Sequence, residues 1–577
     1  MTTDKTHSVD NGRILLLALL LTFGFAVIVG QLFRYQIVQH PHLREISDQQ
    51  VIREKPIVPG RGYITDVNGH LLALDIVEWE VEANPPLVIE IEKTANQLAP
   101  LLQLSEQQVK DALGSPVSWV LLKKQVPQEV GESIRDLNLN GIECNPMPLR
   151  VYPQADLTAH LVGFVNATRE GFYGVEGYYN QQLKPVEGVI KFVQSPIGEP
   201  IPAAPRQESP GRQGTSLILT LDLNIQYIAQ DELERALEEF GAQSGTVIVM
   251  EPRTGALLAL ASYPSYDPNS FATADSRTIS DLSVSGMWEP GSMFKLMTWA
   301  AALDLGTITP DTVFYDSPCT EVGGRSMCNW DNKGHGYVTA TQALAQSLNV
   351  VAAQISTGMG AERFYTYLRR FGLGSPTGVD LASESSGMVR RPGDSNWFPS
   401  DLGTNAFGQG IAVTPIQMIT AVAAIANGGL LTKPHVVDQF VIPEENGQGA
   451  RVIRFQPTIT RRAISEKAAK ELTDMMVVAV DSFTTKAQIP GYRIAGKSST
   501  AQIPTAYGYD PTDTIASYVG FAPADNPRFV ILVKLDRPKS SEWGTQTAAP
   551  TFRAIAERLF LYLKIPPDSV RLAQSPQ

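Results

Sequence analysis

The chain has 577 residues, of which 43% are hydrophobic and 18% are charged, a composition typical of globular proteins rather than disordered ones. Its length predicts two or three domains, and its formal net charge of −12 argues against nucleic acid as a partner. The seven histidines and three cysteines show no metal-ligand spacing, so we expect neither a metal ion nor another cofactor.

The N-terminal region contains one long apolar segment. After a short polar tail over residues 1–13, residues 14–33 carry no charge. At about 1.5 Å per residue a helix of this length spans roughly 30 Å, the thickness of a bilayer core. A signal peptide would have a shorter apolar region and a small-residue cleavage site, which this segment lacks. We therefore predict an uncleaved transmembrane anchor over residues 14–35, with a cytoplasmic N-terminus and an extracytoplasmic bulk.

Residues 36–210 are predicted to form a mixed domain of turns, strands and helices. Asn68 and Gly69 are typical of a tight hairpin before a strand over residues 71–74. Helical patterns cover residues 87–102 and 105–113. We find no nucleophile–base pair here, which favours a spacer or docking role. Residues 197–214 are rich in Pro, Gly and polar residues and are predicted to be a linker.

The region from residue 211 to residue 567 has a regular pattern of strands and helices. Asp222 is predicted to cap an amphipathic helix that Gly241 ends. Strands are predicted over residues 217–220, 245–250, 256–262, 493–500, 514–521 and 529–535, and a closing helix over residues 552–563. Strands at both ends of a long helical middle predict an α+β domain, its antiparallel sheet built from distant segments. A polar tail is expected over residues 568–577.

A candidate nucleophile lies in residues 288–295, Trp-Glu-Pro-Gly-Ser-Met-Phe-Lys. Pro290 and Gly291 predict a turn before a helix. Ser292 would then lie in the first helical turn, with Lys295 on the same face. An amine whose pKa is lowered by burial or by a second cation can take the proton of a serine. The free N–H groups at a helix start suit an oxyanion. Because Ser-x-x-Lys alone is a common pattern, its significance depends on partners.

Two further stretches supply such partners. Ser347 and Asn349 follow a helical pattern and form a Ser-x-Asn motif. Lys497, Ser498 and Ser499 lie on a predicted strand and add a second lysine. Ser-x-x-Lys, Ser-x-Asn and Lys-Ser/Thr-x in this order and spacing are far more specific than any one of them, and they resemble the motifs of penicillin-binding proteins and β-lactamases.

With these motifs the chain resembles a class B penicillin-binding protein, a monofunctional peptidoglycan D,D-transpeptidase with one membrane helix. The resemblance covers nearly the whole length and includes residues 61–69, 160–164, 262–269, 408–411 and 426–429. It implies an α+β fold: a transpeptidase domain like that of penicillin-binding proteins and serine β-lactamases, with an antiparallel sheet flanked by helices. This domain would stand on an elongated mixed α+β pedestal of the dimerisation type.

The resemblance also implies a catalytic role for each motif residue. Ser292 would attack the carbonyl of the penultimate D-alanine of a stem peptide and form an acyl-enzyme. Lys295, kept neutral by burial and by Lys497, would take the serine proton. Ser347 would pass a proton to the departing amine, and Asn349 would hold Lys295 and bind the donor peptide.

The third motif would form the binding strand. Lys497 and Ser498 would hold the terminal carboxylate of the substrate or of a β-lactam, and the backbone N–H groups of Ser292 and Thr500 would form the oxyanion hole. The family usually has glycine where this chain has Ser499. Glycine there lets a ligand approach the strand closely, so we predict that Ser499 crowds the groove, lowers β-lactam affinity or shifts substrate choice.

The implied partners are glycan strands with stem peptides, β-lactams, and a polytopic membrane glycosyltransferase of the cell-wall machinery. A role in division and a role in elongation are both open. The alternatives to a transpeptidase are a catalytically weak scaffold, a β-lactam sensor and a β-lactamase. Cys319 and Cys328 flank a Gly-Gly turn and are either a disulfide formed outside the cytoplasm or two free thiols.

Overall fold

The computed structural model describes residues 11–193, 201, 206–444, 449–505 and 508–573. The chain forms two compact units. The first contains Met1–Pro59, Glu78–Met147 and Val186–Arg212, and the second contains Gly60–Val77, Pro148–Pro185 and Gln213–Gln577. The domain boundaries predicted from the sequence, after residues 13, 35, 210 and 567, stay predictions.

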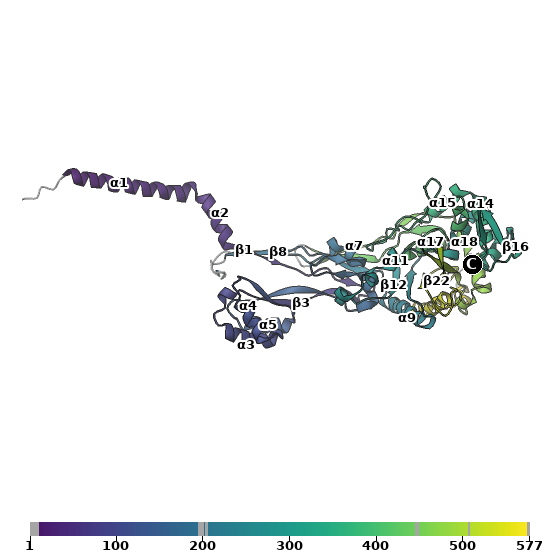
Figure 1. The fold of residues 1–577 in the computed structure, drawn as a ribbon, viewed down its shortest axis with the longest axis horizontal. Coiled ribbons are helices and arrows are strands. Elements are labelled where there is room, and N and C mark those ends of the chain that lie inside the picture. The colour runs from purple at the N-terminus through teal and green to yellow at the C-terminus, as the bar shows by residue number, and fades with distance from the viewer. Residues whose placement is uncertain (1–10, 194–200, 202–205, 445–448, 506–507, 574–577) are drawn as a thin grey trace, which may run out of the picture. The chain divides into compact units, whose positions relative to one another are not determined.

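The first unit begins with α1 (Asn11–Phe33), which continues through a π-helical turn, η1 (Arg34–Val38), and is followed by α2 (His40–Val51). Figure 1 shows α1 as the purple helix. None of the side chains of α1 is buried. Among the described residues, the segment Asn11–Val38 is the one helix long and apolar enough to cross a membrane, in agreement with the predicted anchor.

Two small assemblies complete the first unit. An antiparallel sheet has the order β1-β8-β9. Part of β3 pairs with β4 and β5, and Val81, Leu98, Val109 and Ile134 bury their side chains in one hydrophobic core there. The elements are β1 (Ile52–Ile57), β3 (Leu71–Ala83), η2 (Pro85–Leu87), α3 (Ile91–Leu102), α4 (Glu106–Leu113), β4 (Val120–Val126), α5 (Gln128–Asp136), β5 (Ile142–Val151), β8 (Gly188–Val193) and β9 (Gln207–Ser209). β9 lies in the predicted linker, where it gains backbone hydrogen bonds by pairing with β8.

The second unit is built on a five-stranded antiparallel sheet of order β12-β11-β23-β22-β21. The strands are β11 (Ser244–Met250), β12 (Leu257–Tyr263), β21 (Ala495–Thr505), β22 (Gly508–Ala522) and β23 (Phe529–Asp536). β11 and β23 pair directly although a long helical region separates them in sequence. The predicted antiparallel sheet of distant segments is therefore confirmed.

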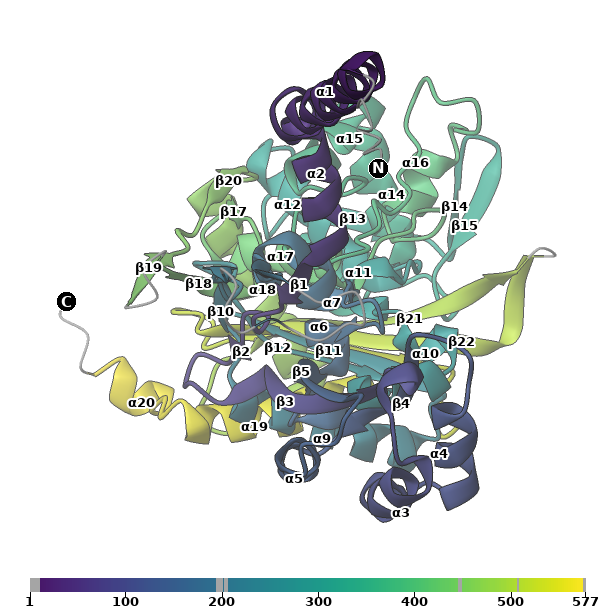
Figure 2. The same ribbon diagram turned by 90° about the vertical axis from the view of Figure 1, so that its left-hand side faces the viewer.

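Helices cover both faces of this sheet, as Figure 2 shows. α9 (Leu223–Phe240) and α19 (Ala548–Tyr562) contact one face, where their apolar side chains share a core with Val247, Ile531 and Val533. The opposite side carries α12 (Lys295–Asp304), α13 (Ala340–Ala345), α14 (Asn349–Met359), α15 (Ala361–Arg370), α16 (Asp401–Asn405), α17 (Pro415–Ala426) and α18 (Glu466–Ser482). As predicted, Asp222 caps α9 by accepting the N–H of Asn224, and Gly241 ends it in a left-handed conformation.

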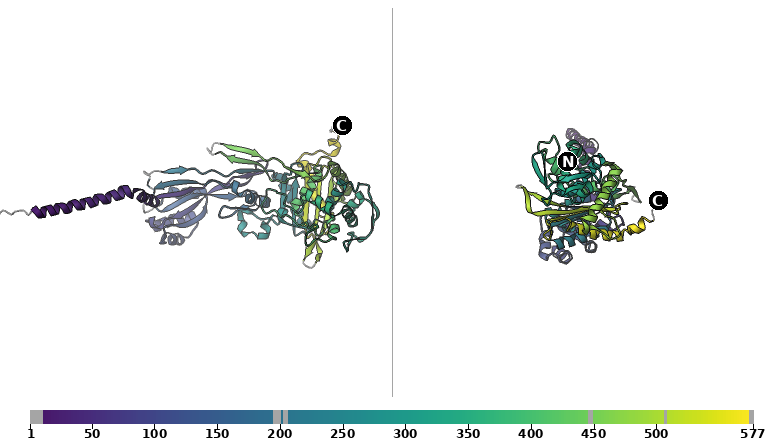
Figure 3. Two further views of the ribbon diagram at one scale, coloured as in Figure 1. Left: turned by 90° about the horizontal axis from the view of Figure 1, so that it is seen from above. Right: turned by 90° about the vertical axis from the view of Figure 1, so that its right-hand side faces the viewer.

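The β21–β22 hairpin extends beyond the rest of the sheet (Figure 2 and Figure 3). β23 pairs with β22 only from Ile515 onward, so the outer part of the hairpin pairs only with itself.

The smaller strands of the unit are β2 (Ile64–Thr65), β6 (Phe164–Val165), β7 (Gly171–Phe172), β10 (Ser216–Leu219), β13 (Val313–Asp316), β14 (Cys319–Val322), β15 (Arg325–Cys328), β16 (Gly336–Thr339), β17 (Leu430–Thr432), β18 (Val437–Pro443), β19 (Ala450–Arg454) and β20 (Ile459–Arg462). Its short helices are η3 (Ala155–Thr158), α6 (Ala159–Val162), α7 (Gly174–Tyr178), α8 (Asn180–Leu183), η4 (Pro268–Thr273), α10 (Ser276–Ile279), α11 (Leu282–Ser285), η5 (Gly291–Phe294), η6 (Thr485–Ala487) and α20 (Asp568–Arg571).

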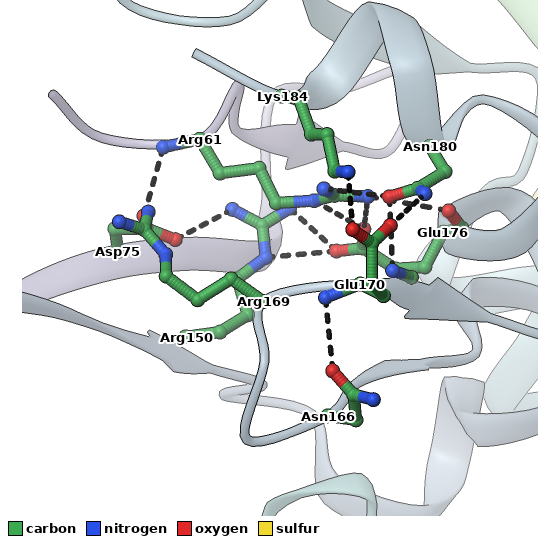
Figure 4. Close-up of polar contacts among 10 residues, drawn as sticks. Arg61, Asp75, Arg150, Asn166, Arg169, Glu170, Glu176, Asn180 and Lys184 are labelled. Carbon is green, nitrogen blue, oxygen red and sulfur yellow. Dashed lines mark hydrogen bonds and ion pairs between the residues drawn. The ribbon is translucent and has the colours of Figure 1, made fainter. Parts of the chain in front are cut away.

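A buried ion network joins remote segments of the second unit, as Figure 4 shows. Glu176 is fully buried. One of its oxygens accepts from Arg61 Nε at 2.7 Å, and the other accepts from Arg150 Nε at 2.8 Å. Arg150 also donates to Asp75 at 3.0 Å. Two buried guanidinium groups therefore pair with two carboxylates in a site with little access to water, and the more exposed Arg169 also pairs with Asp75 at 3.4 Å.

Candidate active site

The predicted nucleophile turn, residues 290–295, has a tighter geometry than predicted. Ser292 lies in the 3₁₀ turn η5, and the α-helix α12 begins only at Lys295. Gly291 has φ = +54°, a left-handed conformation that side chains disfavour, and this redirects the chain into the turn. Ser292 and Lys295 still lie close together, as predicted, with Lys295 Nζ 3.0 Å from Ser292 Oγ.

Lys295 is fully buried and has polar partners around its amine. Nζ donates to the Ser347 carbonyl at 2.5 Å and to Asn349 Oδ1 at 2.8 Å. Burial lowers the pKa of Lys295 well below its usual value, the nearby Lys497 lowers it further, and Asp316 acts in the opposite direction. The amine beside Ser292 is therefore biased toward the neutral form that can accept a proton.

Ser347 lies between the two lysines. It follows α13 and adopts φ = +61°, an uncommon conformation for a residue with a side chain. Its Oγ lies 3.1 Å from Lys295 Nζ and 3.1 Å from Lys497 Nζ. Burial lowers the pKa of Lys497 to about 8. Three remote segments of the chain thus meet at one hydroxyl, and that hydroxyl can relay a proton between two amines.

A second layer of polar residues holds the Ser-x-Asn motif in place. Asn329 Oδ1 accepts the N–H groups of Asn349 and Val350 at 2.9 and 3.2 Å. Asn329 in turn donates to the buried Asp316 at 2.8 Å. Neither Asn329 nor Asp316 was predicted from the sequence. Each acts through backbone groups or through another side chain, and neither belongs to a motif.

The loop before Asn329 is closed by a disulfide between Cys319 and Cys328, one of the two possibilities left open above. These cysteines lie opposite each other on β14 and β15. The Cys328 carbonyl accepts from Asn349 Nδ2 at 3.0 Å. The disulfide therefore anchors a backbone group that helps to orient Asn349.

The predicted binding strand runs past the nucleophile turn. Ser498 and Ser499 lie on β21 and are 9% and 3% exposed. Ser499 Oγ donates to the Pro290 carbonyl at 2.7 Å, and Thr500 Oγ1 accepts the N–H of Gly544 at 3.0 Å. Every residue predicted to act in the site therefore lies in one of three segments. Ser347 links them through its contacts with Lys295 and Lys497, and Ser499 adds a direct contact with Pro290.

Comparison with known proteins identifies the family. Residues 245–557 match the penicillin binding protein transpeptidase domain, and residues 56–219 match the penicillin-binding protein dimerisation domain. The chain belongs to the class B penicillin-binding proteins. It is 31% identical to stage V sporulation protein D of Bacillus subtilis, over 93% of this chain and 84% of that protein.

Other members of the family are similar over most of their length. The chain is 29% identical to a probable peptidoglycan D,D-transpeptidase, PenA, of Neisseria meningitidis, covering 96% of this chain and 93% of that protein. Penicillin-binding protein 3 of Mycobacterium tuberculosis, complexed with aztreonam, has a TM-score of 0.67 and 25% identity, covering 89% of this chain and 98% of that one. The predicted family, α+β transpeptidase fold and serine-type peptidoglycan D,D-transpeptidase activity are confirmed.

Proposed function

We propose that Ser292 is the nucleophile of this penicillin-binding protein and that Lys295 is its general base. The 3.0 Å contact between Lys295 Nζ and Ser292 Oγ supports direct proton transfer, and the lowered pKa of the buried lysine favours the neutral amine, whose free electron pair can accept the proton. As the proton leaves, Oγ bonds to the carbonyl carbon of the penultimate D-alanine. The carbonyl oxygen then becomes an oxyanion, held by the N–H groups of Ser292 and Thr500.

Collapse of this intermediate breaks the peptide C–N bond. The departing D-alanine amine needs a proton, and Lys295 supplies it through Ser347, whose Oγ lies 3.1 Å from Lys295 Nζ. An acceptor amine from a second stem peptide then attacks the acyl-enzyme. A proton passes from that amine through Ser347 to Lys295, and Lys295 gives it to Ser292 Oγ. The bond between Ser292 Oγ and the acyl carbon breaks as the bond to the acceptor nitrogen forms. The product is a new peptide bond, and the enzyme returns to its starting state.

Lys497 and Ser498 bind the terminal carboxylate of the donor in this proposal. Lys497 is only 3% exposed and is hydrogen-bonded to Ser347 Oγ, so a carboxylate beside it would form a desolvated ion pair. Asn349, held by Asn329 and Cys328, keeps Lys295 in place and presents its amide to the donor peptide. The same groups accept a β-lactam.

The observation that carries the proposal is the meeting of Lys295 and Lys497 at Ser347 Oγ. Its test is donor turnover, measured as D-alanine released from stem-peptide substrates by the detergent-solubilised full chain. Lys295→Ala and Ser347→Ala should each lower turnover by at least about 100-fold, because general acid–base catalysis contributes that much. Thr357→Ala, which removes an α14 hydroxyl bonded only within its own helix, is the control and should retain full turnover. Turnover within threefold of wild type in either active-site variant would refute the assigned roles.

The anchor and its partner belong to the same proposal. The membrane segment Asn11–Val38 would place the N-terminus in the cytoplasm and the chain that follows the segment outside it, and the anchor and pedestal would dock on a polytopic membrane glycosyltransferase. A cysteine introduced at Thr3 should react only with membrane-permeant reagents in intact cells, whereas one introduced at Lys467 should react with impermeant ones. The opposite labelling pattern would show that the topology is the reverse of the one proposed.

The proposed partner is tested by affinity purification of the chain from membranes, with identification of a co-purifying polytopic glycosyltransferase.

A further inference from the structure

Ser499 is the one residue of the third motif whose side chain bonds to the nucleophile turn. It is 3% exposed, and its hydroxyl donates to the Pro290 carbonyl at 2.7 Å. Pro290 lies two residues before Ser292, and Ser499 lies immediately before Thr500. The hydrogen bond therefore joins the two segments that supply the proposed oxyanion donors.

The turn has room for this hydroxyl because Gly291 has no side chain. A Cβ at Gly291 would lie 2.6 Å from Ser499 Oγ, closer than such contacts allow. The other side of the turn is equally tight, since a Cβ at Gly408 would lie 2.3 Å from the Gly291 carbonyl oxygen. Gly291 also donates its N–H to the Gly408 carbonyl at 3.2 Å. The turn is thus held between Gly408 on one side and Ser499 on the other.

We propose that Ser499 is a positioning residue that fixes the distance between β21 and the nucleophile turn, and hence the geometry of the oxyanion hole. This inference rests on the proposed roles of Ser292 and Thr500. Two donors on segments so far apart in sequence have no covalent constraint on their separation, and an oxyanion hole loses much of its effect when a donor moves by about 1 Å. The hydrogen bond from Ser499 Oγ to the Pro290 carbonyl supplies such a constraint.

This role and the groove-crowding role predicted from the sequence have opposite consequences. If Ser499 positions the turn, its loss slows acylation and leaves the initial non-covalent affinity unchanged. If Ser499 crowds the groove, its replacement by glycine tightens non-covalent binding and leaves the acylation step unchanged or faster. Saturation kinetics separate the two, because they give the dissociation constant of the initial complex and the acylation rate constant independently.

The experiment uses the full chain in detergent and a fluorescent penicillin, with Ser499→Ala, Ser499→Gly and Ser499→Cys. The cysteine variant keeps the shape of the side chain, with a slightly larger atom in place of the oxygen, but has only a weak donor. The control is Ser356→Ala, which removes another buried serine hydroxyl that donates to a remote carbonyl, that of Leu402, at 2.8 Å. Thermal unfolding of every variant confirms that it is folded.

We expect all three Ser499 variants to lower the acylation rate constant by about fivefold or more, the effect of one neutral hydrogen bond. Their dissociation constants and the pH profile of acylation should be unchanged, because Lys295 and Lys497 are untouched. The Ser356→Ala control should acylate normally. An unchanged acylation rate, a change in the dissociation constant alone, or an equal loss in the control would overturn this inference. Failure of the wild-type chain itself to be acylated would instead refute the proposed function.

Discussion

Replacing Glu176 with glutamine should destabilise the second compact unit by a large and specific amount. Each carboxylate oxygen of this fully buried residue accepts from a different arginine, one from Arg61 and the other from Arg150 (Figure 4). A glutamine offers one oxygen and one NH₂ group, so one arginine would face a donor instead of an acceptor. Breaking a buried ion pair by removing one partner costs about 3–5 kcal/mol. At about 2 °C per kcal/mol for a large domain, the melting temperature should fall by roughly 6–10 °C.

The same network provides a matched control. Glu170 pairs with Lys184, but their side chains are 41% and 30% exposed, and an ion pair so open to water contributes only about 0–1 kcal/mol. Glu170→Gln should therefore lower the melting temperature by about 2 °C at most. The assay is calorimetry of the detergent-solubilised full chain, with penicillin labelling to report the folded site. Equal shifts in the two variants, or a Glu176→Gln shift below about 2 °C, would refute the reasoning about buried charge.

Three further predictions concern the site and its support. Lys497 must be protonated to bind a carboxylate, and burial lowers its pKa to about 8, so the second-order rate constant of acylation should fall above about pH 8. Lys497→Met should abolish this decrease at alkaline pH. A wild-type rate constant that falls only above about pH 10 would contradict this. Asn349→Ala, which removes the 2.8 Å contact to Lys295, should slow acylation by at least about tenfold, measured by stopped-flow labelling and contradicted by a wild-type rate. The double change Cys319→Ala and Cys328→Ala should lower stability by about 2.5 kcal/mol, measured by denaturant unfolding and contradicted by an unchanged midpoint.

The fold was predictable from sequence wherever a local pattern coincided with a structural boundary. Asp222 and Gly241 mark the ends of α9 because a cap and a left-handed stop depend on single residues. The strands of the central sheet were found because their apolar runs are short and bounded by turns. β9 was not found. Its residues are exposed and carry no strand signal of their own, so only pairing with β8 makes them a strand.

The site shows the same division between motif and context. The contacts of Lys295, Ser347 and Asn349 could be expected because the three motifs occur in a recognisable order. Asn329 and Asp316 could not be expected, because they support those motifs only in the folded chain. The Ser499 side chain can point toward the turn because Gly291 has no side chain. This packing depends on two residues that are far apart in sequence, so no local pattern predicts it.

Acylation by benzylpenicillin, followed by intact mass and peptide mapping, tests the central claim most directly. The account predicts one penicilloyl adduct per chain, on the peptide that contains Ser292, and no adduct on the Ser292→Ala variant. An adduct on another residue, or labelling of Ser292→Ala at the wild-type rate, would contradict it.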